Sequence, residues 1–267
     1  MEADNPNTAA EALVLRQDQE GITTLTLNRP NQFNALSEAL LASLQKALDE
    51  IAADASVRVV ILAAAGKAFC SGHDLKEMMA QRGDAYYREL FARCARMMLS
   101  LSELPQPVIA RVHGVATAAG CQLVAQCDLA VAVEGARFAT SGINLGLFCA
   151  TPSVPLVRNV GRKAAFEMLF TGDFIGAERA REIGLINQVV PAEQLDAAVL
   201  RLARAIASKT PVAVTAGKRM FYRQLELGIA AAYDHAAQVM ACNMMSEDTA
   251  EGVNAFFEKR PPQYQGR

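Results

Sequence analysis

Two short segments of the chain combine small side chains with the pattern of a strand that turns into a helix. Residues 69–75 read Phe-Cys-Ser-Gly-His-Asp-Leu, and residues 113–123 read His-Gly-Val-Ala-Thr-Ala-Ala-Gly-Cys-Gln-Leu. A helix start presents unpaired N–H groups and the positive end of the helix dipole. Two converging starts would hold an anion close to the backbone, as an oxyanion hole does for a carbonyl oxygen that gains negative charge. Small residues at a helix start also serve plain packing, and this alternative stays open for each segment alone.

Alternating periodicities around these segments predict an α/β protein. Ser37 and Asp74 stand where side chains can cap helices, and Glu77 completes a capping-box pattern with Asp74. We expect strands at residues 22–28, 57–65, 108–113 and 129–133. We expect helices at residues 37–53, from 74 onward, at 85–102 and at 116–125, with a loop at 66–72.

After residue 192 the pattern becomes entirely helical, with segments at 193–208, 212–227, 229–245 and 247–257. Several large apolar residues occur there: Met220, Phe221, Met240, Met244, Met245, Phe256 and Phe257. A core between the helices and an interface between subunits account for them equally well.

Composition excludes several classes of function. The 267 residues are 52% apolar with a net charge of −2 and no basic block, so we expect no nucleic-acid partner. No apolar run reaches the roughly 18 residues that a membrane helix needs. The six cysteines form no CxxC or Cys/His cluster, so we expect reduced thiols and no metal site. The N-terminus lacks the apolar core of a secretory signal, which predicts a cytoplasmic protein, or a mitochondrial matrix protein if a transit segment has been removed.

Six motifs in order resemble the crotonase (enoyl-CoA hydratase/isomerase) superfamily. The resemblance runs from about residue 12 to about residue 262 and is nearest to enoyl-CoA hydratase domain-containing proteins that lack the usual catalytic glutamates. The motifs are LNRPNQFNAL (27–36), AFCSGHDLKEM (68–78), HGVATAAGCQLVAQCDLAVA (113–132), INLG (143–146), GAERAREIGLINQVVP (176–191) and EGVNAFFEKRPP (251–262).

The resemblance implies a crotonase-type spiral of ββα turns with a C-terminal helical oligomerisation region. Residues 1–200 would form the core that binds acyl-CoA, and residues 201–267 would assemble a homotrimer or hexamer. The backbone N–H groups of Ser71 and Ala119 would be the oxyanion donors. Coenzyme A would enter only as part of the substrate, with no other cofactor. The implied substrate contacts are Asn34, Ala35, Leu36, Ala68, Phe69, Ser71, Asp74, Leu75 and Gly120, with Phe256 and Lys259 often reaching a neighbouring subunit's site.

The chain departs from the family where a hydratase has its two glutamates, which activate water and supply a proton. The first position is Gln122, whose neutral amide can orient a water but cannot take its proton. The second is Gly142, which has no side chain. Each acid or base group is typically worth about 10²–10⁴-fold in rate.

Other polar residues near the implied pocket are His73, Asp74, His113, Ser141, Asn144 and Cys149. Two interpretations of His73 are open. It is either a hydrogen-bonded loop histidine, or it faces the substrate and donates or accepts a proton. Asp74 fits a helix cap better than a catalytic acid, and His113 fits a structural role. Cys149 fits a packing role, because the sequence places no base beside it.

Three functions follow, in this order of preference. The first is an enoyl-CoA hydratase-like lyase that acts on fatty acyl-CoA thioesters with atypical catalytic residues. The second is a malonyl-type acyl-CoA decarboxylase, because loss of CO₂ generates the enolate without a base. Methylmalonyl-CoA decarboxylases of the family carry a similar Gly-His-Asp run, but they keep an acidic residue where this chain has Gln122. The third is a non-catalytic acyl-CoA-binding protein.

Overall fold

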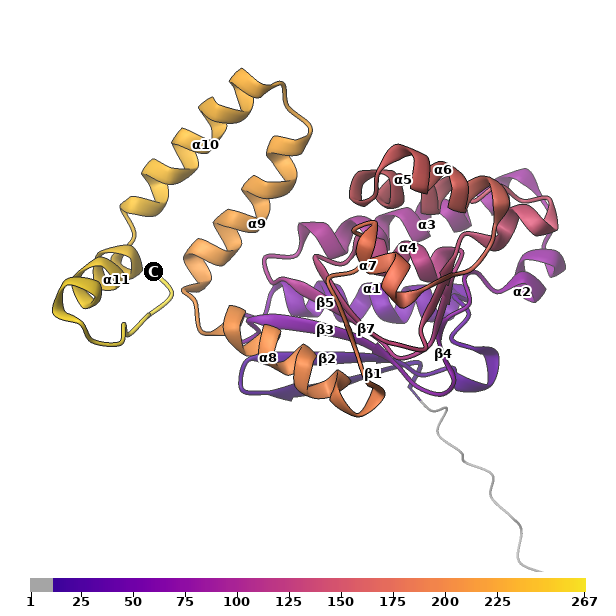
Figure 1. Ribbon diagram of the computed structural model, residues 1–267, viewed down its shortest axis with the longest axis horizontal. Helices are drawn as coiled ribbons and strands as arrows, with labels where there is room; N and C mark the ends of the chain where they lie inside the picture. Colours follow the sequence, from indigo (N-terminus) through magenta and orange to yellow (C-terminus); the bar gives the residue numbers. More distant parts are fainter. Residues whose placement is uncertain (1–11) are drawn as a thin grey trace, which may run out of the picture.

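The computed structural model describes residues 12–267, whose strands form two sheets (Figure 1). The larger sheet has the order β1-β2-β3-β5-β7-β10, in which only the β1–β2 pair is antiparallel. Its strands are Val14–Gln19, Ile22–Leu27, Val59–Ala64, Val108–Val112, Leu129–Val133 and Gln188–Val190. The smaller sheet, β4-β6-β8-β9, consists of Ala68–Cys70, Val115–Thr117, Arg137–Ala139 and Ile175–Gly176. Residues 1–11, on which the expected lack of a signal or transit segment mainly rests, lie outside the described residues.

From β3 to β8, successive strands alternate between the two sheets, which confirms the spiral of ββα turns. The pairs β3–β4, β5–β6 and β7–β8 each place one strand in the larger sheet and the next in the smaller one. Helices follow each pair, and others follow β2, β9 and β10. In chain order they are α1 (Glu38–Ala52), α2 (Leu75–Ala80), α3 (Asp84–Glu103), α4 (Ala119–Gln126), α5 (Ala150–Asn159), α6 (Arg162–Thr171), α7 (Ala177–Glu182) and α8 (Leu195–Ala207).

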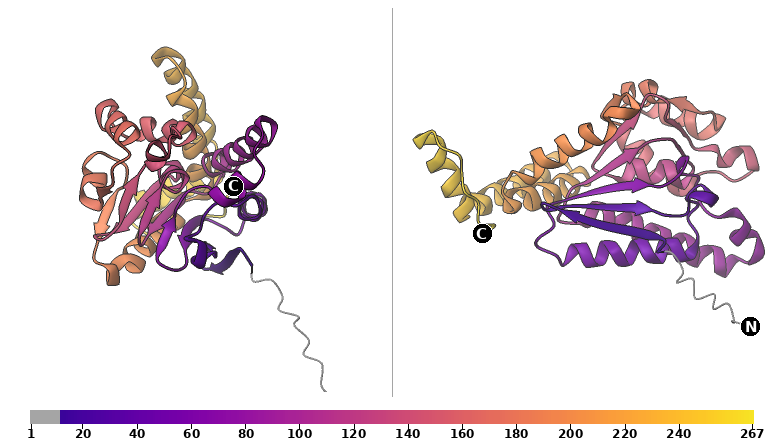
Figure 2. Two further views of the ribbon diagram at one scale, coloured as in Figure 1. Left: turned by 90° about the vertical axis from the view of Figure 1, so that its right-hand side faces the viewer. Right: turned by 90° about the horizontal axis from the view of Figure 1, so that it is seen from below.

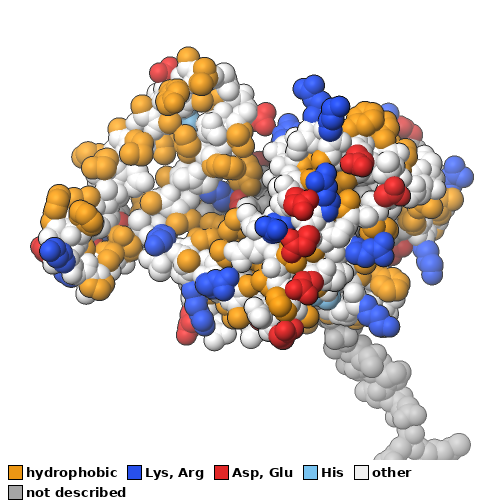
Figure 3. Space-filling view, viewed as in Figure 1, with side chains coloured by type: hydrophobic (Ala, Val, Ile, Leu, Met, Phe, Trp, Pro, Cys, Tyr) orange, Lys and Arg blue, Asp and Glu red, His pale blue; other side chains and the backbone are white. Residues whose placement is uncertain are grey.

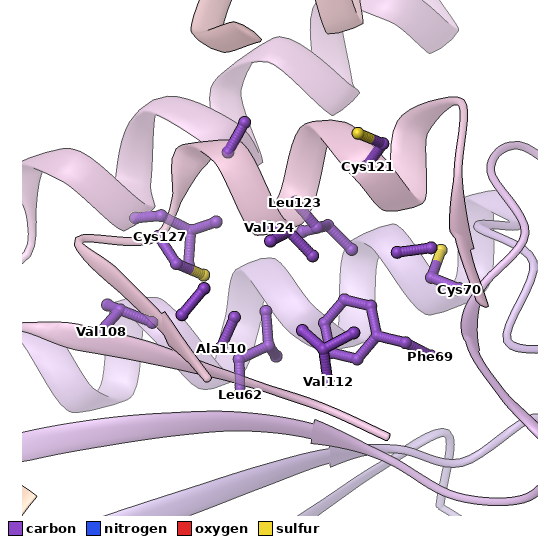
Figure 4. Close-up of a cluster of buried hydrophobic side chains, with 14 of the residues drawn as sticks. Leu62, Phe69, Cys70, Val108, Ala110, Val112, Cys121, Leu123, Val124 and Cys127 are labelled. Carbon is purple, nitrogen blue, oxygen red and sulfur yellow. The ribbon is translucent and has the colours of Figure 1, made fainter. Parts of the chain in front are cut away.

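The core lies between the sheets and the helices that cover them. All six residues of β3 are buried, as a parallel strand with both faces covered requires. Helix α4 is almost entirely buried, and its Leu123 and Val124 face Val112 and Phe69 across the core (Figure 4). The strand that delivers the first small-residue segment and the helix that begins in the second are therefore held rigidly together.

Two helix caps lie where local signals predicted them, although the predicted capping box does not form. The Ser37 side chain accepts a hydrogen bond from Leu40 N, and Asp74 accepts from Lys76 N and Glu77 N. Glu77 does not complete the capping box. It accepts instead from the backbone N–H of Glu38 at 2.9 Å, because α1 lies beside α2 and offers its own unpaired donor.

The described residues form six strands beyond the four expected, and two of these, β4 and β6, lie where other structure was expected. The expected loop at 66–72 contains β4, and the expected start of a helix at Ala116 and Thr117 is β6. Each strand has only three residues, and its partners lie tens of residues away in sequence. No local periodicity can signal a strand that short.

Three helices, α9 (Pro211–Leu225), α10 (Ile229–Met244) and α11 (Glu247–Glu258), extend away from the body (Figures 1 and 2). The preceding helix α8 instead packs on β3, β5 and β7, and the expected division between residues 200 and 201 falls inside it. Helix α10 buries none of its residues within the chain. Within residues 12–267, no helix has the length and apolar character to cross a membrane, and no acidic, Cys and His side chains gather as a metal site would require.

Candidate functional site

The two small-residue segments meet where α4 begins. A Cβ on Gly72, whose φ is +95°, would lie 3.3 Å from Ala119 N, and one on Gly120 would lie 2.0 Å from the Cys70 carbonyl oxygen. Glycine is therefore required at both places by close approach of backbone to backbone. Ala119 is the first residue of α4, and in the described chain its N–H has no hydrogen-bond acceptor. This N–H and the dipole of α4 can stabilise a negative charge that develops on a bound oxygen atom.

The second expected donor, Ser71, is already paired. Its N–H donates to the Phe33 carbonyl at 3.1 Å. Two more hydrogen bonds join residues 33–36 to the loop at 71–74. Leu36 N donates to Gly72 O at 2.8 Å, and Asp74 N donates to Leu36 O at 3.2 Å. Residues 33–36 thus support the loop at 71–74 like a short neighbouring strand. Ser71 N–H can serve an oxyanion only by exchanging Phe33 for the substrate.

Most of the side chains expected to contact coenzyme A are buried. Asn34 is fully buried, where its amide donates to the carbonyls of Ala65 and Ala68 and accepts from Arg29 N. Leu36 and Phe69 belong to the hydrophobic core, and Ala35, Ala68 and Gly120 are also buried. In this conformation, residues 34–36 and 68–69 can offer a ligand only backbone atoms. That these residues bind coenzyme A stays a prediction, and it is limited to contacts made by their backbone atoms.

The Asp74 side chain is engaged in structure, and Phe256 and Lys259 lie far from the start of α4 (Figure 1). Asp74 caps α2 and forms an ion pair with Arg29 at 3.2 Å, so its carboxylate is already engaged in structure. Phe256 and Lys259 are exposed on α11, at the opposite end of the molecule from α2 (Figure 1). These two residues do not join the site within one chain. A role for them would require a second subunit.

A mainly apolar cavity of about 220 Å³ opens beside Ala119. Larger hollows beside α8 and the tail, about 330 and 470 Å³, contain neither helix start. The cavity is lined by residues of the loop at 71–75, helices α2 and α3, the start of α4, and the segment 141–152, which includes the start of α5. These are Ser71, His73, Leu75, Met78, Phe91, Ala118, Ala119, Ser141, Gly142, Leu145, Leu147, Phe148, Cys149, Ala150, Thr151 and Pro152. No Asp or Glu is among them.

The two positions that carry glutamate in a typical hydratase are closed to acid–base chemistry. Gln122 is buried and does not line the cavity, and its Oε1 has no hydrogen-bond partner among the described residues. A Cβ on Gly142 would lie 2.5 Å from the Leu147 carbonyl oxygen and 2.9 Å from Cys149 Sγ. The loop at 147–149 therefore occupies the space that a side chain at position 142 would need.

His73 is held as a neutral ring against the cavity. Phe91 packs edge-on against it with ring centroids 5.4 Å apart, and its buried Nε2 has no hydrogen-bond partner among the described residues. Burial lowers the pKa of His73 to about 4. The ring is therefore uncharged at neutral pH, and its free Nε2 can form one hydrogen bond with a ligand. Burial also raises the pKa of Cys149, which disfavours its nucleophilic thiolate.

The shifted pKa of His73 predicts a loss of stability in acid. The unfolded chain binds this proton near pH 6.5, whereas the folded chain binds it only near pH 4. The contribution of neutral His73 to the free energy of unfolding is therefore complete above pH 6.5. As the pH drops to 4, the free energy of unfolding falls by about 3 kcal/mol. Urea unfolding of the protein and of His73→Asn should show the difference between them shrinking across this window. A difference that stays constant from pH 7.5 to 4 would contradict the assignment.

Two of the other predicted polar residues, His113 and Asn144, have structural partners. His113 Nε2 is 2.9 Å from the Gly66 carbonyl, and Asn144 donates to the Gly172 carbonyl at 3.4 Å. Ser141 lines the cavity, and its hydroxyl lies 2.7 Å from that of Thr117. Phe91 and Met78 were missed, because they reach the cavity from helices whose sequence pattern resembles that of any packed helix.

Comparison with known proteins agrees with this architecture. The family model described as enoyl-CoA hydratase/isomerase matches residues 17–267. Enoyl-CoA hydratase domain-containing protein 3, mitochondrial, of Xenopus laevis is 47% identical over 250 residues, or 94% of this chain and 85% of that protein. An enoyl-CoA hydratase structure from Mycobacterium smegmatis is 59% identical, with a TM-score of 0.94, and the match covers 95% of this chain and 99% of that one. The human domain-containing protein 3 structure is 44% identical, with a TM-score of 0.92, covering 94% and 100%.

Proposed function

The chain belongs to the enoyl-CoA hydratase/isomerase (crotonase) family, and from this premise we propose that it binds fatty acyl-CoA thioesters and polarises their carbonyl group. One observation carries the proposal: the unpaired Ala119 N–H, at the start of α4, opens on an apolar cavity. The thioester oxygen would accept from Ala119 N–H, and from Ser71 N–H once Phe33 is displaced. Negative charge that develops on this oxygen would be stabilised by the helix dipole and by the low polarity of the cavity.

For the reaction, we propose an enoyl-CoA hydratase-like lyase with an atypical catalytic set. Gln122, which does not itself line the cavity, would orient a buried water through its unpaired Oε1, and His73, which does line it, would form a hydrogen bond to the water or the substrate. Neither group replaces an ionised glutamate, because the amide does not titrate and burial disfavours the imidazolium. Hydration of crotonyl-CoA should therefore be at least about 10⁴-fold slower than in a hydratase with both glutamates.

Decarboxylation of a malonyl-type thioester is the second candidate. The bond to CO₂ breaks and its electron pair becomes the enolate, so the step needs an oxyanion hole but no base. The absence of Asp and Glu from the cavity lining favours it, since a carboxylate there would repel the substrate carboxylate. A non-catalytic acyl-CoA-binding role is the remaining alternative.

Mass spectrometry of acyl-CoA incubated with the protein tests these proposals. The panel contains crotonyl-CoA, a longer enoyl-CoA, methylmalonyl-CoA and a saturated acyl-CoA, and calorimetry measures binding in parallel. Slow gain of water supports the lyase, and loss of CO₂ selects the decarboxylase. Binding without turnover leaves the non-catalytic role. Failure of every thioester to bind would overturn the proposal.

We also propose a homotrimer or a pair of trimers. Exposed Phe221, Met240, Met244, Met245, Phe256 and Phe257 on and beside α9–α11 support it, and Figure 3 shows apolar side chains along this tail. Coenzyme A is the only cofactor proposed, as part of the substrate. A cytoplasmic or mitochondrial matrix location remains a proposal, the second supported by the word mitochondrial in the name of the Xenopus laevis relative.

A further inference from the structure

Helix α6 presents two phenylalanine side chains on its outer face. Phe166 is 59% exposed and Phe170 is 52% exposed, whereas Ala165, Met168 and Leu169 on the inner face are buried. The helix therefore already contributes an apolar face to the core, and its outer phenylalanines are not needed there. Figure 3 shows the resulting apolar patch over α6. Contiguous exposed aromatic surface of this kind commonly marks a binding site.

The two rings are ordered and connect to the cavity beside Ala119. Phe166 and Phe170 stack with centroids 3.9 Å apart and an interplanar angle of 11°. Phe148 lies 5.2 Å from Phe170, and Phe148 also lines the cavity. We call Phe148, Phe166 and Phe170 the aromatic shelf. Through Phe148, an apolar surface continues from the oxyanion site out of the cavity and along α6.

The size of the cavity leaves part of a long ligand outside. Its volume is about 220 Å³, below the roughly 300–1,000 Å³ of pockets that enclose drug-sized molecules. It can hold a thioester group with a short acyl chain. A longer acyl chain must extend out of the cavity through its opening. Leu145 and Leu147, which line the cavity and are also exposed, make this opening apolar next to Phe148.

We propose that the aromatic shelf binds the distal part of the acyl chain, so that this protein prefers acyl-CoA thioesters with chains of about eight or more carbons. The inference rests on the proposed function and names its substrate class. Full burial of a methylene is worth about a fourfold factor in an equilibrium constant, and a surface that covers one side gives about twofold. Across several methylenes, these factors produce a clear dependence of affinity on chain length.

Calorimetric titration with butyryl-, octanoyl- and dodecanoyl-CoA tests the proposal, since these saturated thioesters cannot be hydrated. We expect dodecanoyl-CoA to bind at least about 10-fold more tightly than butyryl-CoA. The double variant Phe166→Gln/Phe170→Gln should lose most of that gain and keep its affinity for butyryl-CoA. The matched control is Phe174→Gln. Phe174 is also exposed, but it does not line the cavity, and its ring packs against the Arg137 guanidinium at 4.6 Å.

The outcomes separate this inference from the function on which it rests. If even butyryl-CoA fails to bind, the proposed function falls and the inference falls with it. If butyryl-CoA binds but affinity does not rise with chain length, or rises equally in the double variant, only the shelf proposal is overturned. Sedimentation of the double variant supplies the third arm. A change in its oligomeric state would assign the shelf to contact between copies and overturn the proposal.

Discussion

Gly120→Ala is expected to destabilise the protein by at least about 3 kcal/mol and to abolish thioester binding. The new Cβ would lie 2.0 Å from the carbonyl oxygen and 2.7 Å from the carbonyl carbon of Cys70. Both are backbone atoms, and β4 and α4 are buried, so neither side can move without disturbing the core. Any shift that relieves the clash separates Ala119 N–H from the loop at 71–72. Urea unfolding and calorimetric titration with an acyl-CoA measure the two effects.

Gly217→Ala is the matched control for this change. Gly217 lies inside α9, and a Cβ there would meet nothing within 4 Å. Because alanine favours a helix over glycine, the control should be unchanged or more stable by up to about 1 kcal/mol. If Gly120→Ala behaves like Gly217→Ala, then α4 does not depend on close approach to Cys70.

Lys218→Met should cost about 3–5 kcal/mol of stability, because it leaves a carboxylate without its cationic partner. Lys218 reaches from α9 into the body, where its buried ammonium lies 2.7 Å from Asp128 and donates to the carbonyls of Leu101 and Gln106. Tyr222 also donates to Asp128 at 2.7 Å. Burial lowers the pKa of Lys218, while the nearby Asp128 carboxylate opposes the shift. Urea unfolding followed by circular dichroism measures the loss.

Two further variants isolate the ion pair. Lys209→Met removes an exposed lysine from the segment that leads into α9 and should change stability by less than about 0.5 kcal/mol. Lys218→Met/Asp128→Asn removes both charges and should recover part of the loss. If Lys218→Met costs under 1 kcal/mol, the ion pair is not what attaches α9 to the body.

Much of the site could be predicted from the residues themselves. The roles of Ser37 and Asp74 as caps depend on neighbours within a few residues, whereas the helix expected from Ala116 begins only at Ala119, because β6 precedes it. The missing carboxylates at Gln122 and Gly142 are visible in the sequence once the motifs are aligned with the family. The Lys218–Asp128 pair could not be predicted in this way, since its members stand 90 residues apart.

The sequence by itself determined the α/β class, the ββα spiral through its family motifs, the helical C-terminal region and the loss of the glutamate pair, because periodicity, capping and residue identity are local properties. Only the tertiary structure decided that Ser71 N–H is engaged by Phe33, that Leu147 and Cys149 close the space beside Gly142, and that His73 is held neutral beside Phe91. Each of these depends on contact between segments that the chain keeps apart. Such contacts arise from packing of the whole core, and they set which donors are free and which groups carry charge.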